Sequence, residues 1–159
     1  GLGIIILSTL GFILMKTGNS WVALLAFCMV AALLAFFIYN KYPASIFPGD
    51  TLTFSVGAFI AMVAIMGNAE KFAVILMVPY FFEFILKARA LMQKESFAKL
   101  NDDGSLDVPH KKFYGLEHIA IALIQKIKGK AYEEDVVFVL FGVQLIFVVI
   151  ALYVFLMQF

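Results

Sequence analysis

Long runs of apolar residues alternate with short polar stretches along this chain of 159 residues. A helix crosses the hydrocarbon core of a bilayer with about 20 mainly apolar residues, and polar residues then mark its two ends. Five runs approach this pattern, and we expect each of them to be a transmembrane helix: residues 1–15, 21–39, 51–66, 72–86 and 136–159. The predicted fold class is therefore an all-α polytopic membrane protein. Residues 1–86 hold four helices and a connection at 40–50, and residues 87–135 form a long polar segment before the last helix.

The first run is short for a membrane span. At ~1.5 Å per residue, residues 1–15 reach about 22 Å, against roughly 30 Å of hydrocarbon. The run also has no initiator Met and no basic region before it. We therefore expect the chain to be a piece of a longer polypeptide with further helices upstream.

Composition supports a lipid setting, because 64% of the residues are hydrophobic and only 14% are charged. Soluble domains are nearer half apolar and a quarter charged. The net charge of +1 argues against a nucleic-acid partner, and the single Cys28 excludes a disulfide framework and a cysteine-rich metal site.

The basic residues fall unevenly on the two sides of the predicted membrane. Ten of the twelve Lys and Arg residues lie in the connection 40–50 or in the segment 87–135. Cytoplasmic loops carry an excess of Lys and Arg, so both regions are predicted to face the cytoplasm.

The segment 87–135 carries two structural signals. Asp103-Gly104 between Leu100 and Leu106 predicts a small β-hairpin. Apolar residues at broadly helical spacing from Phe113 to Ile127, ended by Lys126, Lys128 and Lys130, predict an amphipathic helix on the cytoplasmic membrane interface. The alternative is that this helix is a cytoplasmic extension of a neighbouring span.

Signatures of soluble enzymes are absent, and the strongest candidate chemistry is the string Ile46-Phe47-Pro48-Gly49-Asp50-Thr51. A carboxylate at a membrane boundary, beside a glycine that lets a ligand approach the backbone, suits Mg²⁺ held together with substrate phosphates. Phe47 offers an aromatic face for a nucleobase. The alternatives are that Asp50 is an ordinary N-cap and that Phe47 is a hydrophobic staple or interface anchor.

Two further groups of polar residues stand out. Glu83 lies in an apolar run with Lys87 four residues later, which favours a structural ion pair over a functional acid. Cations for a diphosphate are available on the side of Asp50, or else these residues form a patch for lipid headgroups: Lys94, Lys99, His110, Lys111 and Lys112. His118 is interpreted as a packing or interface residue.

The string Asn40-Lys41-Tyr42-Pro43-Ala44-Ser45-Ile46-Phe47-Pro48-Gly49-Asp50-Thr51 resembles the polyprenyl-phosphate N-acetylhexosamine-1-phosphate transferase superfamily, glycosyltransferase family 4. The likeness is nearest to archaeal and eukaryotic dolichyl-phosphate GlcNAc-1-phosphotransferases. Span number, long loop and hairpin signal also correspond, so this chain looks like the C-terminal five helices of a ten-helix fold.

The resemblance implies transfer of N-acetylhexosamine-1-phosphate, such as GlcNAc-1-phosphate, from a UDP-amino sugar to a polyprenyl or dolichyl phosphate, with release of UMP. It makes Asp50 the catalytic ligand of Mg²⁺, with Mn²⁺ as the alternative, and assigns Phe47 and Gly49 to the nucleotide. It assigns the diphosphate to the loop cations, although the family's Arg/His-rich motif or His triplet is replaced here by Lys94, Lys99 and His110-Lys111-Lys112. Other acidic residues of such a site would belong to an N-terminal half, so this piece alone is expected to be inactive.

The implied partners are thus the nucleotide sugar, the lipid phosphate, membrane lipid and the N-terminal half of the same enzyme, with a homodimer as an open option. The implied location is multi-pass in a cell or endoplasmic reticulum membrane, with the active site cytoplasmic. A non-enzymatic polytopic protein, either a transporter or a scaffold subunit, is the competing hypothesis.

Overall fold

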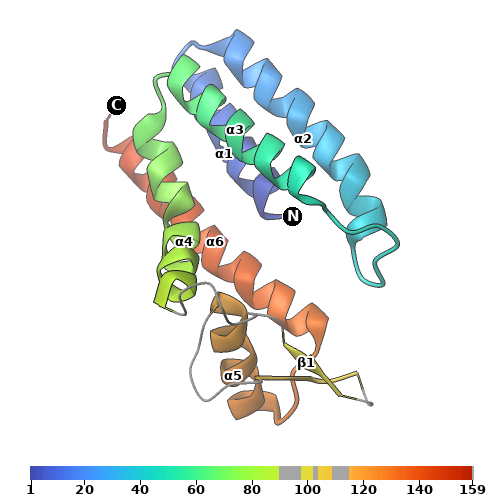
Figure 1. The fold of residues 1–159 in the computed structure, drawn as a ribbon. Coiled ribbons are helices and arrows are strands. Elements are labelled where there is room, and N and C mark those ends of the chain that lie inside the picture. Colours follow the sequence, from blue (N-terminus) through green and yellow to red (C-terminus); the bar gives the residue numbers. More distant parts are fainter. Residues whose placement is uncertain (90–97, 102–103, 109–114, 159) are drawn as a thin grey trace. The chain divides into compact units, whose positions relative to one another are not determined.

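The computed structural model describes residues 1–89, 98–101, 104–108 and 115–158 (Figure 1). Helices account for most of these residues, and each of the five apolar runs is helical. The described helices are α1 (Leu2–Lys16), α2 (Ser20–Asn40), α3 (Asp50–Met66), α4 (Glu70–Arg89), α5 (Leu116–Lys128) and α6 (Glu133–Leu156). The strands are β1 (Lys99–Leu100) and β2 (Leu106–Asp107).

The chain divides into two compact units. The first unit combines Gly1–Met77 with Gln144–Phe159, and the second is Val78–Val143. Helices α4 and α6 each contribute residues to both units. Each unit has a hydrophobic cluster of its own.

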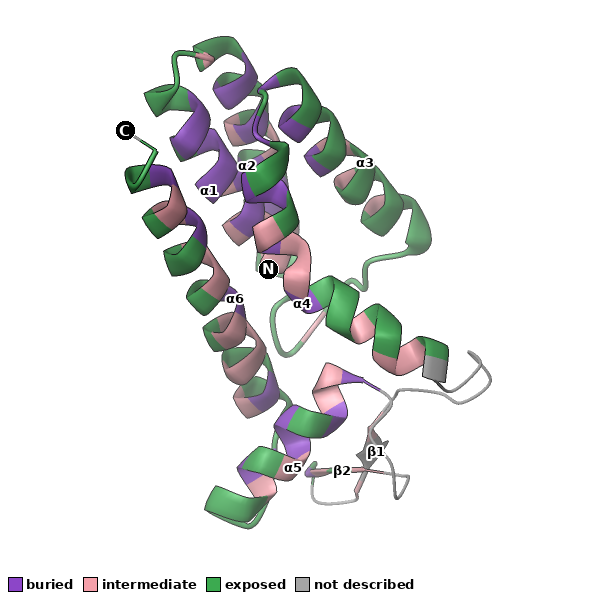
Figure 2. Cartoon of the chain, turned by 90° about the vertical axis from the view of Figure 1, so that its left-hand side faces the viewer, coloured by how far each residue is buried: buried purple, intermediate pink, exposed green. Residues whose placement is uncertain are grey.

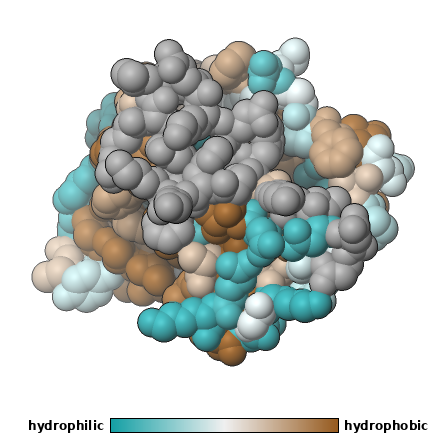
Figure 3. All heavy atoms as spheres, turned by 60° about the horizontal axis from the view of Figure 1, so that its bottom comes forward, coloured by the Kyte–Doolittle hydropathy of each residue, from teal (hydrophilic) through white to brown (hydrophobic). Residues whose placement is uncertain are grey.

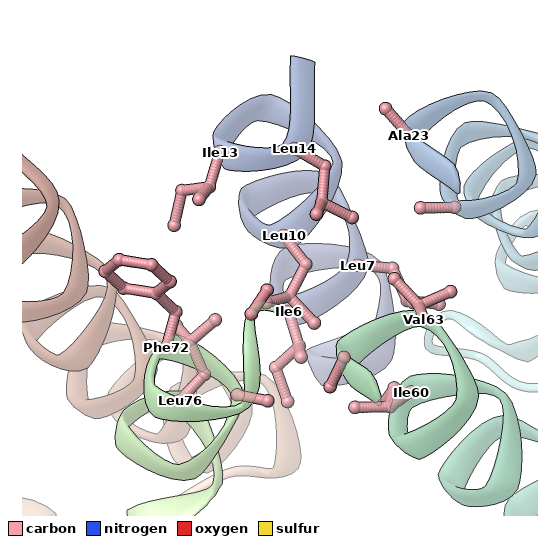
Figure 4. Close-up of a cluster of buried hydrophobic side chains, with 14 of the residues drawn as sticks. Ile6, Leu7, Leu10, Ile13, Leu14, Ala23, Ile60, Val63, Phe72 and Leu76 are labelled. Carbon is pink, nitrogen blue, oxygen red and sulfur yellow. The ribbon is translucent and has the colours of Figure 1, made fainter. Parts of the chain in front are cut away.

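Helix α1 is the centre of the first unit. Its side chains Ile6, Leu7, Leu10, Ile13 and Leu14 are fully buried. Figure 4 shows them pointing towards side chains of α2, α3 and α4, among them Ala23, Val63 and Leu76. The burial colouring in Figure 2 shows the same contrast, because α1 is largely buried while α2 and α3 carry long exposed faces. A helix that is apolar on every side is typical of a protein core or a membrane span, and α1 buries most of its large aliphatic side chains within the protein while Phe12 and Met15 stay exposed.

Crowding at the end of α3 explains one glycine in this bundle. A Cβ atom added at Gly67 would lie 2.3 Å from Leu14 Cδ2 and 2.9 Å from the backbone oxygen of Val63. The oxygen of Gly67 also accepts a hydrogen bond from Asn19 Nδ2 at 2.9 Å. The turn between α1 and α2 is thereby joined to the turn between α3 and α4.

The second unit contains the hairpin and α5. Strands β1 and β2 are antiparallel, with Leu100 opposite Leu106, which is where the Asp-Gly sequence predicts the hairpin. Ala120, Ile121 and Ile124 of α5 form a cluster with Ala131 and Val136. Gln125 Nε2 donates to the backbone oxygen of Leu106, so the hairpin is hydrogen-bonded to α5.

Two of the described helices, α2 and α6, are long and apolar enough to cross a membrane, and α1 and α3 are apolar but shorter. Only 22% of the apolar window of α2 and 17% of that of α6 are buried in the protein. The core helix of a soluble protein would be mostly buried. The exposed apolar faces of α2 and α6 therefore suit contact with lipid.

Candidate functional site

The connection between α2 and α3 is folded back on the end of α2. The backbone oxygen of Tyr39 accepts hydrogen bonds from the amides of Ser45 and Ile46, at 2.8 and 3.2 Å. The side chain of Asn40 donates from Nδ2 to the oxygen of Ile46 at 2.9 Å. Asn40 therefore fixes the residue that directly precedes Phe47, a role that the sequence pattern did not reveal.

Phe47 projects from this folded connection. Its side chain is 77% exposed, more than any other large hydrophobic residue described. The alternative interpretation of Phe47 as a hydrophobic staple is therefore wrong, because a staple must be packed against the first turn of its helix. An exposed aromatic ring on an ordered loop is free to stack on a planar ligand.

Asp50 is the first residue of α3 and is exposed. The alternative interpretation of Asp50 as the N-cap is also wrong. The N-cap is Gly49, in extended conformation, and no side chain caps α3. The Asp50 carboxylate thus has no capping hydrogen bond to make, while its charge is still favoured by the positive end of the helix dipole.

The packing of the fold does not require a glycine at position 49. A Cβ atom added there would meet nothing within 4 Å, and its φ of −86° is open to any residue. Its oxygen accepts from the amides of Leu52 and Thr53. The open space beside the uncapped start of α3 is suited to a phosphate, because amide groups at a helix N-terminus bind anions.

A divalent cation would find a single carboxylate at this junction. Among the described residues, no three His, Cys, Asp or Glu side chains are grouped so as to hold a metal ion. Mg²⁺ often takes only one or two carboxylates and completes its octahedron with water and substrate phosphates. Asp50, exposed beside the open space at Gly49, fits that kind of site.

The structure brings Phe47, Gly49 and Asp50 together at one junction of the first unit. Of the predicted diphosphate-binding cations, Lys99 belongs to β1 in the second unit, where its backbone is paired with Asp107. The other four lie outside the described residues: Lys94, His110, Lys111 and Lys112.

Glu83 has the structural role that its spacing predicts. Its Oε1 lies 3.0 Å from Lys87 Nζ. Its Oε2 also accepts a hydrogen bond from the backbone amide of Leu116 at 2.6 Å. Glu83 therefore caps α5 from a position 33 residues earlier in the chain, where the local N-cap, Gly115, has no side chain to offer.

A second carboxylate lies near this cap. Burial raises the pKa of Glu117 above its usual value of 4.5, the negative charge of Glu83 raises it further, and Lys87 acts in the opposite direction. Glu117 in the first turn of α5 therefore interacts electrostatically with Glu83 and Lys87 of α4.

Two polar side chains, those of His118 and Gln144, are fully buried in the described part of the chain. His118 is fully buried in the second unit, as the packing interpretation predicts. Gln144, fully buried in the first unit, donates from Nε2 to the oxygen of Leu76 at 3.0 Å. This bond lies one turn before Pro79, which has no amide hydrogen of its own to give to the helix.

Comparison with known proteins finds a family match for the part of the chain that contains this junction. Residues 1–68 match the model of Glycosyl transferase family 4, a range that includes Phe47, Gly49 and Asp50. Residues 1–68 are thus similar to the family 4 glycosyl transferases, and the resemblance expected from residues 40–51 is confirmed.

Two archaeal relatives match almost the whole chain. A protein of Saccharolobus solfataricus named "Putative UDP-N-acetylglucosamine--dolichyl-phosphate N-acetylglucosaminephosphotransferase" is 41% identical over 95% of this chain and 46% of its own length. A protein of the same name from Sulfolobus acidocaldarius is 31% identical over 95% of this chain and 45% of its own length.

A phospho-N-acetylmuramoyl-pentapeptide-transferase of Staphylococcus carnosus is 44% identical over 44% of this chain and 22% of its own length. The chain spans about half the length of the two archaeal relatives from Saccharolobus solfataricus and Sulfolobus acidocaldarius.

Proposed function

We propose that this chain forms part of a membrane enzyme that transfers N-acetylglucosamine-1-phosphate from a UDP-sugar to a polyprenyl or dolichyl phosphate and releases UMP. The observation that carries the proposal is the junction of Phe47, Gly49 and Asp50, whose exposed groups the fold does not use for its own packing or capping. The names of the relatives supply the substrate classes.

The proposed reaction forms one P–O bond and breaks another. An oxygen of the lipid phosphate attacks the β-phosphorus of the UDP-sugar, and the bond between that phosphorus and the bridging oxygen breaks. The bridging oxygen leaves with UMP, and the sugar becomes attached to the lipid through a diphosphate.

Each residue of the junction has a part in this chemistry. Phe47 stacks on the uracil ring, which its exposed position permits. Gly49 leaves space for the diphosphate beside the amides that begin α3. Asn40 acts as a positioning residue, since its bond to Ile46 sets the course of the loop that carries Phe47.

Asp50 would hold Mg²⁺, or Mn²⁺ in its place, with the remaining ligands drawn from substrate oxygens and water. Such a cation supplies charge neutralisation for the diphosphate and the departing nucleotide. The basic residues Lys94, Lys99, His110, Lys111 and Lys112 would add further positive charge to the diphosphate.

All five apolar helices are proposed to cross the membrane. Support comes from exposed apolar side chains along α2, α3 and α6, such as Leu24, Phe54 and Val149. Helix α1 is short, but most of its large aliphatic side chains pack against the other helices of its unit, so its length need not match the bilayer. The lysine distribution places the α2–α3 connection on the cytoplasmic side, where nucleotide sugars occur.

The chain is proposed to work together with the N-terminal half of the same enzyme. Its archaeal relatives are about twice as long as the part that matches. A site with one described carboxylate would draw further acidic residues from that half, so these 159 residues on their own are expected to be inactive. A homodimer of the whole enzyme is compatible with the same scheme.

The test is Asp50→Asn in the longest native polypeptide that contains this sequence, assayed in membranes for UMP release from UDP-GlcNAc with added Mg²⁺. Loss of the metal-dependent turnover is expected, because an amide is a far weaker Mg²⁺ ligand than a carboxylate.

The matched control is Glu70→Gln. Glu70 is also an exposed acid at the first position of an apolar helix, α4, but it begins its helix on the opposite side of the proposed membrane. Its turnover should stay at the unsubstituted level. Equal activity of the two variants would refute the metal role of Asp50, and absence of any UMP release from the native polypeptide would refute the transferase itself.

A further inference from the structure

Helix α5 has two apolar faces, and only one of them is packed in the protein. Ala120, Ile121 and Ile124 are buried in the cluster of the second unit. Three large aliphatic side chains lie on the other side of the helix at i, i+4 and i+8, with exposures of 43, 50 and 75%: Ile119, Leu123 and Ile127. We refer to these three residues as the outer stripe.

A groove extends the outer stripe to α6. The groove has a volume of about 240 Å³ and is lined mainly by apolar side chains: Ile124, Ile127, Lys128, Asp135, Phe138 and Val139. Ile127 is a member of both the stripe and the groove, and Phe138 on the α6 side is 72% exposed. The stripe, the groove and the exposed apolar face of α6 are therefore one continuous surface.

Charge marks the boundary of this surface. The exposed lysines Lys126 and Lys128 end α5, and the acids Glu133, Glu134 and Asp135 form the first turn of α6. Figure 3 shows strongly hydrophilic and strongly hydrophobic side chains lying next to one another on this side of the molecule. Such a border between charged and apolar groups is typical of a headgroup region.

The depth of the groove follows from helix geometry. Phe138 comes three to five residues after the acids of α6, which at ~1.5 Å per residue puts it about 5–8 Å further along the helix. Because α6 is apolar enough to cross a membrane, its first acids lie near the headgroups and Phe138 lies below them. Interfacial helices bury their apolar face by a similar distance, roughly 5–10 Å.

We propose that the outer stripe and the α5–α6 groove form a lipid-docking surface that holds α5 at the headgroup boundary of the membrane. The occupant is the hydrocarbon of membrane lipids. The charged groups at the border, including Lys128 in its ion pair with Asp135, lie at the level of the headgroups. This surface goes beyond the proposed transfer reaction and does not depend on it.

The test uses the longest native polypeptide carrying this sequence with Cys28→Ala, reconstituted in vesicles of phosphatidylcholine and phosphatidylglycerol. Single cysteines are introduced as Leu123→Cys and Ile127→Cys and labelled with an environment-sensitive fluorophore. Both positions are exposed, so the label replaces no packed core contact. The matched control is Glu134→Cys, an exposed position in the first turn of α6.

At positions 123 and 127 we expect blue-shifted emission, stronger quenching by lipid with a nitroxide near the carbonyl than near the chain end, and little quenching by iodide. At position 134 we expect stronger quenching by iodide.

Iodide quenching at 123 and 127 equal to that at 134 would overturn the proposal, because the stripe would then face water. Protection from both quenchers would also overturn it. In that case disulfide formation between copies of the Ile127→Cys variant would identify a second copy as the occupant, and its absence would identify another part of the same polypeptide.

Discussion

The two units of this protein differ in the kind of contact that stabilises each of them internally. In the first unit, α1 packs through fully buried aliphatic side chains such as Leu10 and Ile13, and its hydrogen bonds to other elements are few. In the second unit, a small apolar cluster is supplemented by polar ties, among them Glu83 to Leu116 and Gln125 to Leu106. The first unit should therefore respond to changes in side-chain volume, and the second to changes in charge and hydrogen bonding.

The largest effect is expected for Leu10→Ala in the first unit. Leu10 is fully buried, and truncation of a buried leucine costs about 2–5 kcal/mol through lost burial and the cavity left behind. Thermal unfolding of the detergent-solubilised protein measures the change. Leu24→Ala, at a position 63% exposed on α2, should leave the transition nearly unmoved. Similar shifts for both variants would contradict a central role for α1.

The next effect is expected for Glu83→Ala in the second unit. The substitution removes the charged acceptor that caps α5 and the partner of Lys87, and hydrogen bonds to charged groups are worth about 1.5–3 kcal/mol. Amide hydrogen exchange should accelerate in α5 while exchange in α1 stays unchanged. Lys87→Ala, which keeps the cap, should have the smaller effect, because a partly exposed ion pair contributes roughly 0–1 kcal/mol. Equal acceleration in α1 would show that the contrast between the units is wrong.

A pH dependence should distinguish the second unit further. The pKa of Glu117 is raised in the folded protein, chiefly by burial, so the folded state binds this proton more tightly than the unfolded state does. Stability from Glu117 is therefore present at low pH and is lost as pH rises from about 4.5 through the folded-state pKa. Protection of α5 amides measured across this range should follow that decline, and Glu117→Gln should flatten it. An unchanged slope in the variant would assign the dependence to another group.

The smallest effect on stability is expected for Gly49→Ala, at a position outside the hydrophobic clusters of both units. A methyl group at this position meets no atom within 4 Å, so the unfolding transition should move by less than about 0.5 kcal/mol. In contrast, the KM for UDP-GlcNAc in the longest native polypeptide should rise, because the methyl group occupies space assigned to the diphosphate. A normal KM would remove Gly49 from the proposed site.

Much of the helical architecture could be predicted from local sequence, and the candidate site could be proposed from it. The apolar runs are interrupted by charges at intervals close to a membrane thickness, so they predict α1, α2, α3, α4 and α6 within a few residues. The Asp-Gly turn predicts the hairpin, and the i, i+4 spacing predicts the pair of Glu83 with Lys87. Phe47, Gly49 and Asp50 lie within four residues of one another, and grouping such close neighbours into a candidate site needs no knowledge of the fold.

Contacts between distant residues were decided only by the tertiary structure. The length of α1 gives no hint that its aliphatic side chains form the centre of the core of its unit, and no sequence rule connects Glu83 with the amide of Leu116. An aspartate directly before an apolar run is typical of an N-cap, but in the structure Gly49 takes that position and the Asp50 carboxylate is exposed. Local spacing determines which residues share an element or a turn. Which side chains become buried, capped or open to a ligand depends on elements that meet across the fold.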